Sequence, residues 1–288
     1  MSSTFDRSAT VIDFFAGIEA TVAEALREDL GPGDATASLI DPARQATAAI
    51  TVREPAVLCG QRWFDEVFRQ IDPGVDVQWQ ARDGDWLASD TLVCALHGNA
   101  RSLVTGERTA LNFLQTLSGT ATTTQGFVEQ LRGTPTRLLD TRKTIPGLRR
   151  AQKYAVRCGG GYNHRAGLYD GVLVKENHIA AAGSVAAAIA GLRRAGVQLP
   201  VEVEVERMAQ VEEAIGAGAD MLLLDNFTFD QLREAVGIAA GRVRLEASGG
   251  FGYDDLPAIG ATGVDFVSIG SLTKHLRATD FSMRIAHD

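Results

Sequence analysis

Cysteine is scarce in this chain, which has three among 288 residues, at positions 59, 94 and 158. The number is odd, the spacings are wide and no Cys-x-x-Cys pair occurs, so the pattern excludes a disulfide framework and gives no zinc-binding spacing. The N-terminus lacks the basic stretch followed by an apolar stretch that marks a signal peptide. The apolar runs are too short to span a membrane. These absences predict reduced thiols in a cytoplasmic protein.

Excess positive charge is also missing, since the chain has 28 basic and 36 acidic residues and a net charge of −8. That balance argues against general binding to nucleic acid or to anionic membranes. Residues 132–165 are the exception, with nine Arg or Lys against one acid. This local concentration predicts an anion site. For four members of the run a solvated helix face, alone or combined with anion binding, is the favoured interpretation: Arg149, Arg150, Lys153 and Arg157.

Two patterns of secondary structure follow one another along the chain. A helix is expected over residues 11–30, strands over 46–60 and 75–96 around a helix at 61–71, and a helix over 103–131 with a break near Ser118-Gly119. After residue 136, six short apolar strands alternate with helical stretches, the pattern of βα units. No Gly-x-Gly-x-x-Gly follows the first of them, which disfavours a doubly wound dinucleotide fold. The predicted fold class is α/β, with an incomplete TIM-like α/β barrel after a mixed α+β part.

Charged or small residues end nearly all of the six expected strands. In α/β barrels the carboxyl ends of the strands carry the functional groups. The strand Val-Glu-Val-Glu-Val-Glu places Glu202, Glu204 and Glu206 on one face, and buried unpaired carboxylates would be costly. Facing cations, a metal or a cationic transition state would supply the missing charge, while an exposed strand is a credible alternative for Glu202. The strand-end candidates are Asp140, Arg142, Lys143, Lys175, Glu176, Glu204, Glu206, Asp225, Asn226, Glu246, Ser248, Ser268 and Gly270.

Three glycine-rich segments complete the candidate site. The turns at 248–252 and 268–271 follow the last two strands, where many barrels bind phosphate through backbone N–H groups. The run from Cys158 to Arg165 contains three consecutive glycines before His164-Arg165. It predicts a mobile loop that carries cationic groups to a ligand, and a plain flexible connector is the alternative.

The chain resembles the quinolinate phosphoribosyltransferases, also called nicotinate-nucleotide pyrophosphorylases (carboxylating), over nearly its whole length. The matching motifs are Leu30-Gly-Pro-Gly-Asp-Ala-Thr36, Gly106-Glu-Arg-Thr-Ala-Leu-Asn-Phe113, Asp140-Thr-Arg-Lys-Thr-Ile-Pro-Gly147, Gly159-Gly-Gly-Tyr-Asn-His-Arg165, Lys175-Glu-Asn-His178, Glu202-Val-Glu204, Leu224-Asp-Asn226 and Ala247-Ser-Gly-Gly250. Asp-Thr-Arg-Lys-Thr with the downstream His-Arg is the most specific of them, and no motif position departs from the family pattern.

The resemblance implies an N-terminal α/β open sandwich domain at 1–113, on which 275–288 pack back, and a barrel domain at 114–274. It implies a Mg²⁺-dependent reaction of quinolinate with phosphoribosyl pyrophosphate that yields nicotinate mononucleotide, pyrophosphate and CO₂ for NAD synthesis. Members are dimers or assemblies of dimers, with Arg108 reaching the neighbouring site.

The resemblance also assigns roles to residues. Lys143, Lys175, Glu204 and Asp225 are the implied catalytic residues, and the last two would also hold the metal. The implied substrate-binding set is Arg108, Thr141, Arg142, Lys143, His164, Arg165, Lys175, Glu204, Asp225, Ser248, Gly249, Gly250 and Gly270.

Three alternatives stay open at this point. The same scaffold serves phosphoribosyltransferases with another acceptor, such as nicotinate, and molybdenum-associated homologues. A Schiff-base aldolase would use Lys175 as its nucleophile. A non-catalytic anion-binding protein would leave the strand-end carboxylates without a role.

Overall fold

The structure is a computed structural model that describes residues 12–286, and it divides into two compact units. Unit 2 contains residues 13–125, 144–160 and 272–286, and unit 1 consists mainly of residues 126–143 and 161–271. The chain therefore leaves and re-enters each unit. No helix in the described range is both long and apolar enough to cross a membrane.

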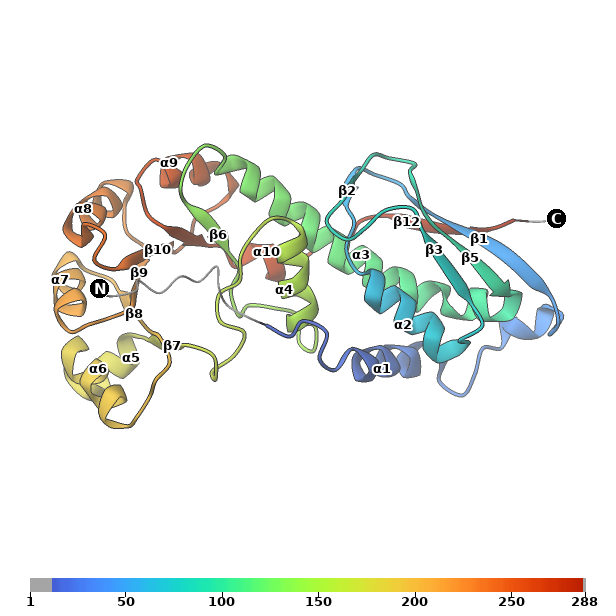
Figure 1. Cartoon of the computed structure of the whole chain (residues 1–288), viewed down its shortest axis with the longest axis horizontal. Coiled ribbons are helices and arrows are strands. Elements are labelled where there is room, and N and C mark those ends of the chain that lie inside the picture. Colours follow the sequence, from blue (N-terminus) through green and yellow to red (C-terminus); the bar gives the residue numbers. More distant parts are fainter. Residues whose placement is uncertain (1–11, 287–288) are drawn as a thin grey trace. The chain divides into compact units, whose positions relative to one another are not determined.

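Unit 2 is built on a four-stranded antiparallel sheet with the order β12-β1-β5-β3. The strands are β1 (Gln45–Val52), β3 (Asp76–Trp79), β5 (Leu92–Asn99) and β12 (Phe281–Ile285), and β2 (Ala56–Val57) pairs separately with β4 (Trp86–Leu87). Figure 1 shows the last strand of the chain lying beside β1. Alternate residues of β1 are buried, as expected for a sheet with one face covered.

The helices of unit 2 share one apolar core with this sheet. They are α1 (Ile18–Leu30), α2 (Gln61–Ile71) and α4 (Arg149–Cys158), with the 3₁₀ turn η2 (Thr36–Leu39), while α3 (Ala100–Gln130) runs through both units. The core joins Ile50 of β1, Phe64 of α2 and Leu114 of α3. The helix expected at 61–71 is confirmed. The helix expected at 11–30 ends where predicted but begins at Ile18, and position 11 lies outside the described residues.

The expected break near Ser118-Gly119 is wrong, because α3 is continuous from residue 100 to residue 130. A Cβ on Gly119 would lie 2.1 Å from the carbonyl oxygen of Arg277. Ser118 also has a specific structural role in the helix, since its hydroxyl accepts a hydrogen bond from the backbone N–H of Cys59. These residues allow close packing of the backbone and are not helix breakers.

Unit 1 is built on a parallel six-stranded sheet with the order β6-β11-β10-β9-β8-β7, which confirms the predicted α/β class and all six expected strands. Figure 1 shows its helices along the outer side of the sheet. Within the described residues the hydrogen-bonded ladder is open between β6 and β7, as an incomplete barrel requires. The strands are β6 (Arg137–Leu139), β7 (Val172–Val174), β8 (Val201–Val205), β9 (Met221–Asp225), β10 (Arg244–Ser248) and β11 (Phe266–Ser268).

The connections between these strands are mostly helical. They contain α5 (Glu176–Ala182), α6 (Val185–Arg194), α7 (Met208–Gly216), α8 (Phe229–Ala239), η3 (Tyr253–Asp255) and α9 (Leu256–Gly260), and α10 (Ser271–Lys274) follows β11. Because the strands are parallel, their carboxyl ends meet at one edge of the sheet. That edge is where the charged strand-end residues gather.

Candidate active site at the carboxyl edge of the parallel sheet

A pocket of about 360 Å³ opens at the carboxyl ends of the unit 1 strands. It brings together nine residues of the implied substrate-binding set with four others of the same unit. The nine are Thr141, Arg142, Lys143, His164, Arg165, Lys175, Glu204, Asp225 and Ser248. The others are the strand-end candidates Glu246 and Ser268, and Leu173 and Leu223.

The strand register explains how this set converges. Glu204 of β8 and Glu246 of β10 both lie beside Leu223 of β9, so the three side chains form one row across the sheet. Asp225 and Ser248, paired two residues further along, form the next row toward the carboxyl edge. Since side chains of register-aligned residues point to the same face, both rows face the pocket.

Lys175 and Glu204 form a close charge pair in this pocket. The Nζ of Lys175 lies 2.7 Å from Oε2 of Glu204, whose side chain is 11% exposed. Lys175 is the N-cap of α5, directly after β7. The other predicted carboxylate, Asp225, accepts a hydrogen bond from the side-chain amide of Asn226. The pocket therefore contains both signs of charge at the same strand ends.

Asp140 at the end of β6 fixes the glycine-rich loop that carries His164 and Arg165. Its carboxylate is fully buried and accepts hydrogen bonds from the side chain of Asn163 at 2.7 Å and from the backbone N–H of His164 at 2.8 Å. Arg165 is itself buried and donates to the carbonyl of Gly171. The expected loop is thus held in place here by strand β6.

Both ring nitrogens of His164 have partners within unit 1. Nδ1 accepts a hydrogen bond from the backbone N–H of Arg165, so the ring proton belongs on Nε2. Nε2 lies 3.0 Å from Oε2 of Glu202 and 3.6 Å from Oε2 of Glu246. A direct contact of a ring nitrogen with a substrate carboxylate would require His164 to give up one of these interactions.

The exposed-strand interpretation of Glu202 is wrong. Its side chain is 1% exposed, whereas Glu206, which follows the end of β8, is exposed. The physical reason is the partner, because His164 lies opposite Glu202 and supplies a hydrogen-bond donor in the interior. A buried carboxylate is tolerated when such a donor offsets its desolvation.

The three predicted phosphate-binding glycines do not line this pocket among the described residues, and their predicted role stays a prediction. Gly249 has φ +139°, and a Cβ there would lie 2.7 Å from the side-chain oxygen of Asn226. A Cβ on Gly270 would lie 3.0 Å from Cδ of Lys143, while Gly250 faces open space. Gly270 therefore leaves room for the Lys143 side chain.

Sequence reasoning missed the apolar wall of the pocket, which is formed by Leu173 and Leu223. Each lies two residues before a predicted strand-end residue, Lys175 or Asp225, and strand alternation puts it on the same face. That spacing is the signal that would have found both. Asn163 was also missed, and its link to Asp140 depends on a tertiary contact.

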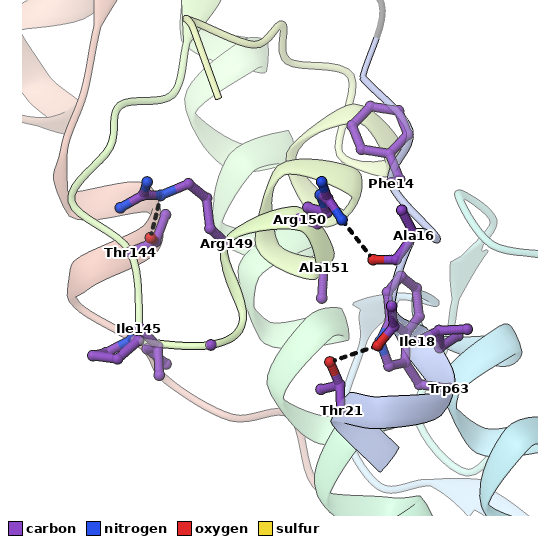
Figure 2. Close-up of a pocket in the computed structure, with 13 residues that line it drawn as sticks. Phe14, Ala16, Ile18, Thr21, Trp63, Thr144, Ile145, Arg149, Arg150 and Ala151 are labelled. Atoms are coloured by element: carbon purple, nitrogen blue, oxygen red, sulfur yellow. Dashed lines mark hydrogen bonds between the residues drawn. The ribbon is translucent and has the colours of Figure 1, made fainter. Parts of the chain in front are cut away.

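The solvated-face interpretation of the basic run is wrong for Lys153, which is fully buried, while Arg150 and Arg157 are exposed. Arg149 and Arg150 border a separate hollow of about 440 Å³ in unit 2 (Figure 2). There Arg149 donates to the hydroxyl of Thr144, and Arg150 donates to the carbonyl of Ala16. The run thus divides into a part that lines the active-site pocket and a helical part on α4.

Arg108 lies on α3 within unit 2 and is exposed.

Comparison with known proteins assigns this arrangement to a family. Residues 34–118 match the family model of the quinolinate phosphoribosyl transferase N-terminal domain, and residues 120–284 match that of the C-terminal domain. The chain belongs to the quinolinate phosphoribosyltransferase family.

Individual members of the quinolinate phosphoribosyltransferase family are similar over almost the whole chain. It is 42% identical over 90% of its length to the probable nicotinate-nucleotide pyrophosphorylase [carboxylating] of Bacillus subtilis, covering 90% of that protein. The Mycobacterium leprae nicotinate-nucleotide pyrophosphorylase [carboxylating] is 42% identical over 91% of this chain and 95% of its own. The solved nicotinate-nucleotide pyrophosphorylase of Francisella tularensis superposes with a TM-score of 0.92 at 44% identity, covering 99% and 100% of the two chains.

Proposed function

We propose that the chain transfers the phosphoribosyl group of phosphoribosyl pyrophosphate to quinolinate, with loss of CO₂, to give nicotinate mononucleotide and pyrophosphate for NAD biosynthesis. Membership of the family and the names of relatives at 42% identity support this activity. The observation that carries it is the pocket in which four cationic side chains and three carboxylates meet at the carboxyl edge of the parallel sheet.

The cationic half of the pocket suits a dianionic aromatic acceptor. Arg142, Lys143, Arg165 and Lys175 all line it, and Arg side chains bind carboxylates through two parallel hydrogen bonds. The apolar side chains of Leu173 and Leu223 would pack against a pyridine ring between these charges. Two carboxylates on the acceptor would use this charge more fully than the single one of nicotinate.

The carboxylate side chains of the pocket suit the ribose of the phosphoribosyl donor. In the proposed reaction the ring nitrogen of quinolinate forms a bond to the anomeric carbon while the bond to pyrophosphate breaks, so positive charge develops on the ribose. Glu204 and Asp225, on neighbouring strands, would stabilise that charge and bind ribose hydroxyls. Lys143 would neutralise negative charge on the pyrophosphate leaving group.

Decarboxylation completes the sequence. The C2 carboxylate leaves as CO₂, the electron pair of the broken bond stays at C2 as a carbanion next to the positively charged pyridinium nitrogen, and C2 then takes a proton from water. The step needs no general base. It agrees with the geometry of His164, whose two ring nitrogens already have partners within the protein.

The residues present fit a magnesium ion. Hard carboxylate oxygens are the ligands that Mg²⁺ prefers, and Glu204 and Asp225 provide them at adjacent strand ends. When bound with the pyrophosphate donor, the ion would add charge neutralisation on the leaving group. Lys175, already paired with Glu204, would set the position of that carboxylate.

Assembly and location are parts of the same proposal. We infer a homodimer, or an assembly of dimers, in which the exposed Arg108 reaches the neighbouring subunit's pocket and adds a fifth cation. The three cysteines are free thiols, which favours a reducing compartment, and we propose the cytoplasm.

The direct test is to incubate the purified chain with quinolinate, phosphoribosyl pyrophosphate and Mg²⁺. We expect equal amounts of CO₂ and pyrophosphate, and little product when nicotinate replaces quinolinate. Turnover of nicotinate at the same rate would overturn the acceptor assignment. Covalent trapping of a carbonyl substrate on Lys175 by borohydride would favour the aldolase, although the ion pair with Glu204 is unlike the isolated amine that such chemistry needs.

A further inference from the structure

Unit 2 contains a cluster of two thiols and a carboxylate: Cys59, Asp83 and Cys158, called here the thiol–carboxylate cluster. Both sulfur atoms and one carboxylate oxygen lie within 4.8 Å of one another. Cys59 lies just before α2, Asp83 lies between β3 and β4, and Cys158 is the last residue of α4. The three come from separate parts of the chain, so no local spacing in the sequence predicts the cluster.

The carboxylate of Asp83 is held in one orientation by its neighbours. Its Oδ1 accepts hydrogen bonds from the backbone N–H groups of Gly60 at 2.9 Å and Gln61 at 3.3 Å. Its Oδ2 accepts a hydrogen bond from the hydroxyl of Tyr154 at 3.0 Å and keeps acceptor capacity. Orientation of a ligand by such outer hydrogen bonds is typical of metal sites.

We propose that the thiol–carboxylate cluster binds a thiophilic divalent cation of the zinc class. Two sulfur ligands with one carboxylate select such a metal over Mg²⁺ or Ca²⁺, which prefer oxygen ligands alone. Binding converts both thiols to thiolates, so two protons leave as one divalent ion enters. Cys158 and Asp83 are half-buried, which gives the ion a path from solvent and leaves the fourth position to water.

The site is distinct from the proposed phosphoribosyl-transfer site. Its residues all belong to unit 2, whereas the pocket with Glu204 and Asp225 belongs to unit 1. The bound ion would tie the end of α4 to the start of α2 and to the turn between β3 and β4. Its role is therefore structural, and its test does not depend on the activity of the enzyme.

The experiment titrates the full-length, chelator-treated chain with Cd²⁺ alone in the presence of a non-chelating phosphine reductant. We expect a thiolate-to-metal charge-transfer band that saturates at one equivalent, with release of about two protons per ion at neutral pH. Zn²⁺ should abolish the band by competition, and excess Mg²⁺ should not. Absence of the band in the wild-type chain would overturn the proposal.

Substitutions within the thiol–carboxylate cluster test whether the charge-transfer band comes from its thiolates. Cys158→Ser should reduce its amplitude to that of a single thiolate, and Asp83→Asn should weaken Cd²⁺ binding at least about tenfold. The matched control is Cys94→Ser, which alters the third cysteine, buried on β5. An unchanged band in Cys158→Ser, or an equal loss in Cys94→Ser, would refute the site. Thermal unfolding without metal checks that each variant is folded. If a serine variant does not fold, the alanine variant at the same position, Cys158→Ala or Cys94→Ala, is used in its place.

Discussion

The glutamates of the segment from Val201 to Glu206 share a face but meet different surroundings. Glu202 is buried against His164, Glu204 is paired with Lys175 in the pocket, and Glu206 is exposed. Strand alternation predicted the shared face from the sequence. The order of burial could not be predicted in the same way, because it depends on which residue of a distant loop lies opposite each carboxylate.

Glu204 and Asp225 carry the residue-scale prediction for the proposed function. We expect Glu204→Gln and Asp225→Asn each to lower kcat roughly 100-fold, because each removes a negative charge next to the developing positive charge of the ribose. The substitutions keep the side-chain size, so KM for quinolinate should change much less. Steady-state kinetics with both substrates measures the two effects separately.

The matched control for this prediction is Glu206→Gln, which removes the same charge from an exposed position after the same strand. Its kcat should stay within about twofold of the wild-type value, since surface charges are screened by solvent. Equal losses in Glu206→Gln and Glu204→Gln would mean that the effect comes from net charge and not from the pocket.

At the scale of elements, periodicity located the helices and strands better than it located their interruptions. All six parallel strands and the helix at 61–71 are where the apolar pattern placed them. The break expected at Gly119 is absent from α3, because a glycine in a helix signals either flexibility or close approach, and only the position of Arg277 decides between them. Similarly, α1 begins at Ile18 and not at residue 11, because its N-cap Gly17 has φ +82°, a left-handed conformation that no helix contains.

Gly119→Ala should destabilise the protein by about 1–3 kcal/mol, because the added methyl group would meet the carbonyl oxygen of Arg277 and force backbone to move. The same substitution at Gly126, further along α3, provides the comparison. A Cβ there would lie 3.7 Å from the ring of Tyr253, an ordinary contact. Gly126→Ala should therefore stabilise the helix by about 0.5–1 kcal/mol.

Urea unfolding followed by circular dichroism measures both changes. We expect the two substitutions to change the free energy of unfolding in opposite directions. If Gly119→Ala proved as stable as Gly126→Ala, the close approach of the Arg277 carbonyl would not be the reason for glycine at position 119.

At the scale of the whole molecule, the residues of the candidate site were predictable from the sequence because topology gathers them. A parallel sheet brings the carboxyl ends of all its strands to one edge, so Lys175, Glu204 and Asp225 converge without any knowledge of their contacts. Cys59, Asp83 and Cys158 follow no such rule. They meet through the packing of a loop, a turn and a helix end, which no periodicity encodes.

The proposed assembly predicts complementation between two inactive variants. Arg108→Ala lacks the cation donated to a neighbour, and Lys175→Ala lacks part of its own pocket. A mixed dimer would have one complete site, and random exchange makes half of the dimers mixed, so activity should recover to about a quarter of the wild-type value.

The measurement is the rate of pyrophosphate release after the two variants are unfolded together and refolded, with each variant refolded alone as the control. Mixed dimers are identified by a size tag on one variant. If mixed dimers form and remain as inactive as their parents, Arg108 does not act in the neighbouring site.

The pairing of β12 with β1 has a consequence for biosynthesis. Strand β12 ends at Ile285 and is synthesised after every other described element, yet it belongs to the sheet whose first strand begins at Gln45. The six strands of the other sheet have all been translated by residue 268. The sheet of unit 1 therefore needs no residue after 268, while the edge of β1 that pairs with β12 stays unpaired until residues 281–285 have been synthesised.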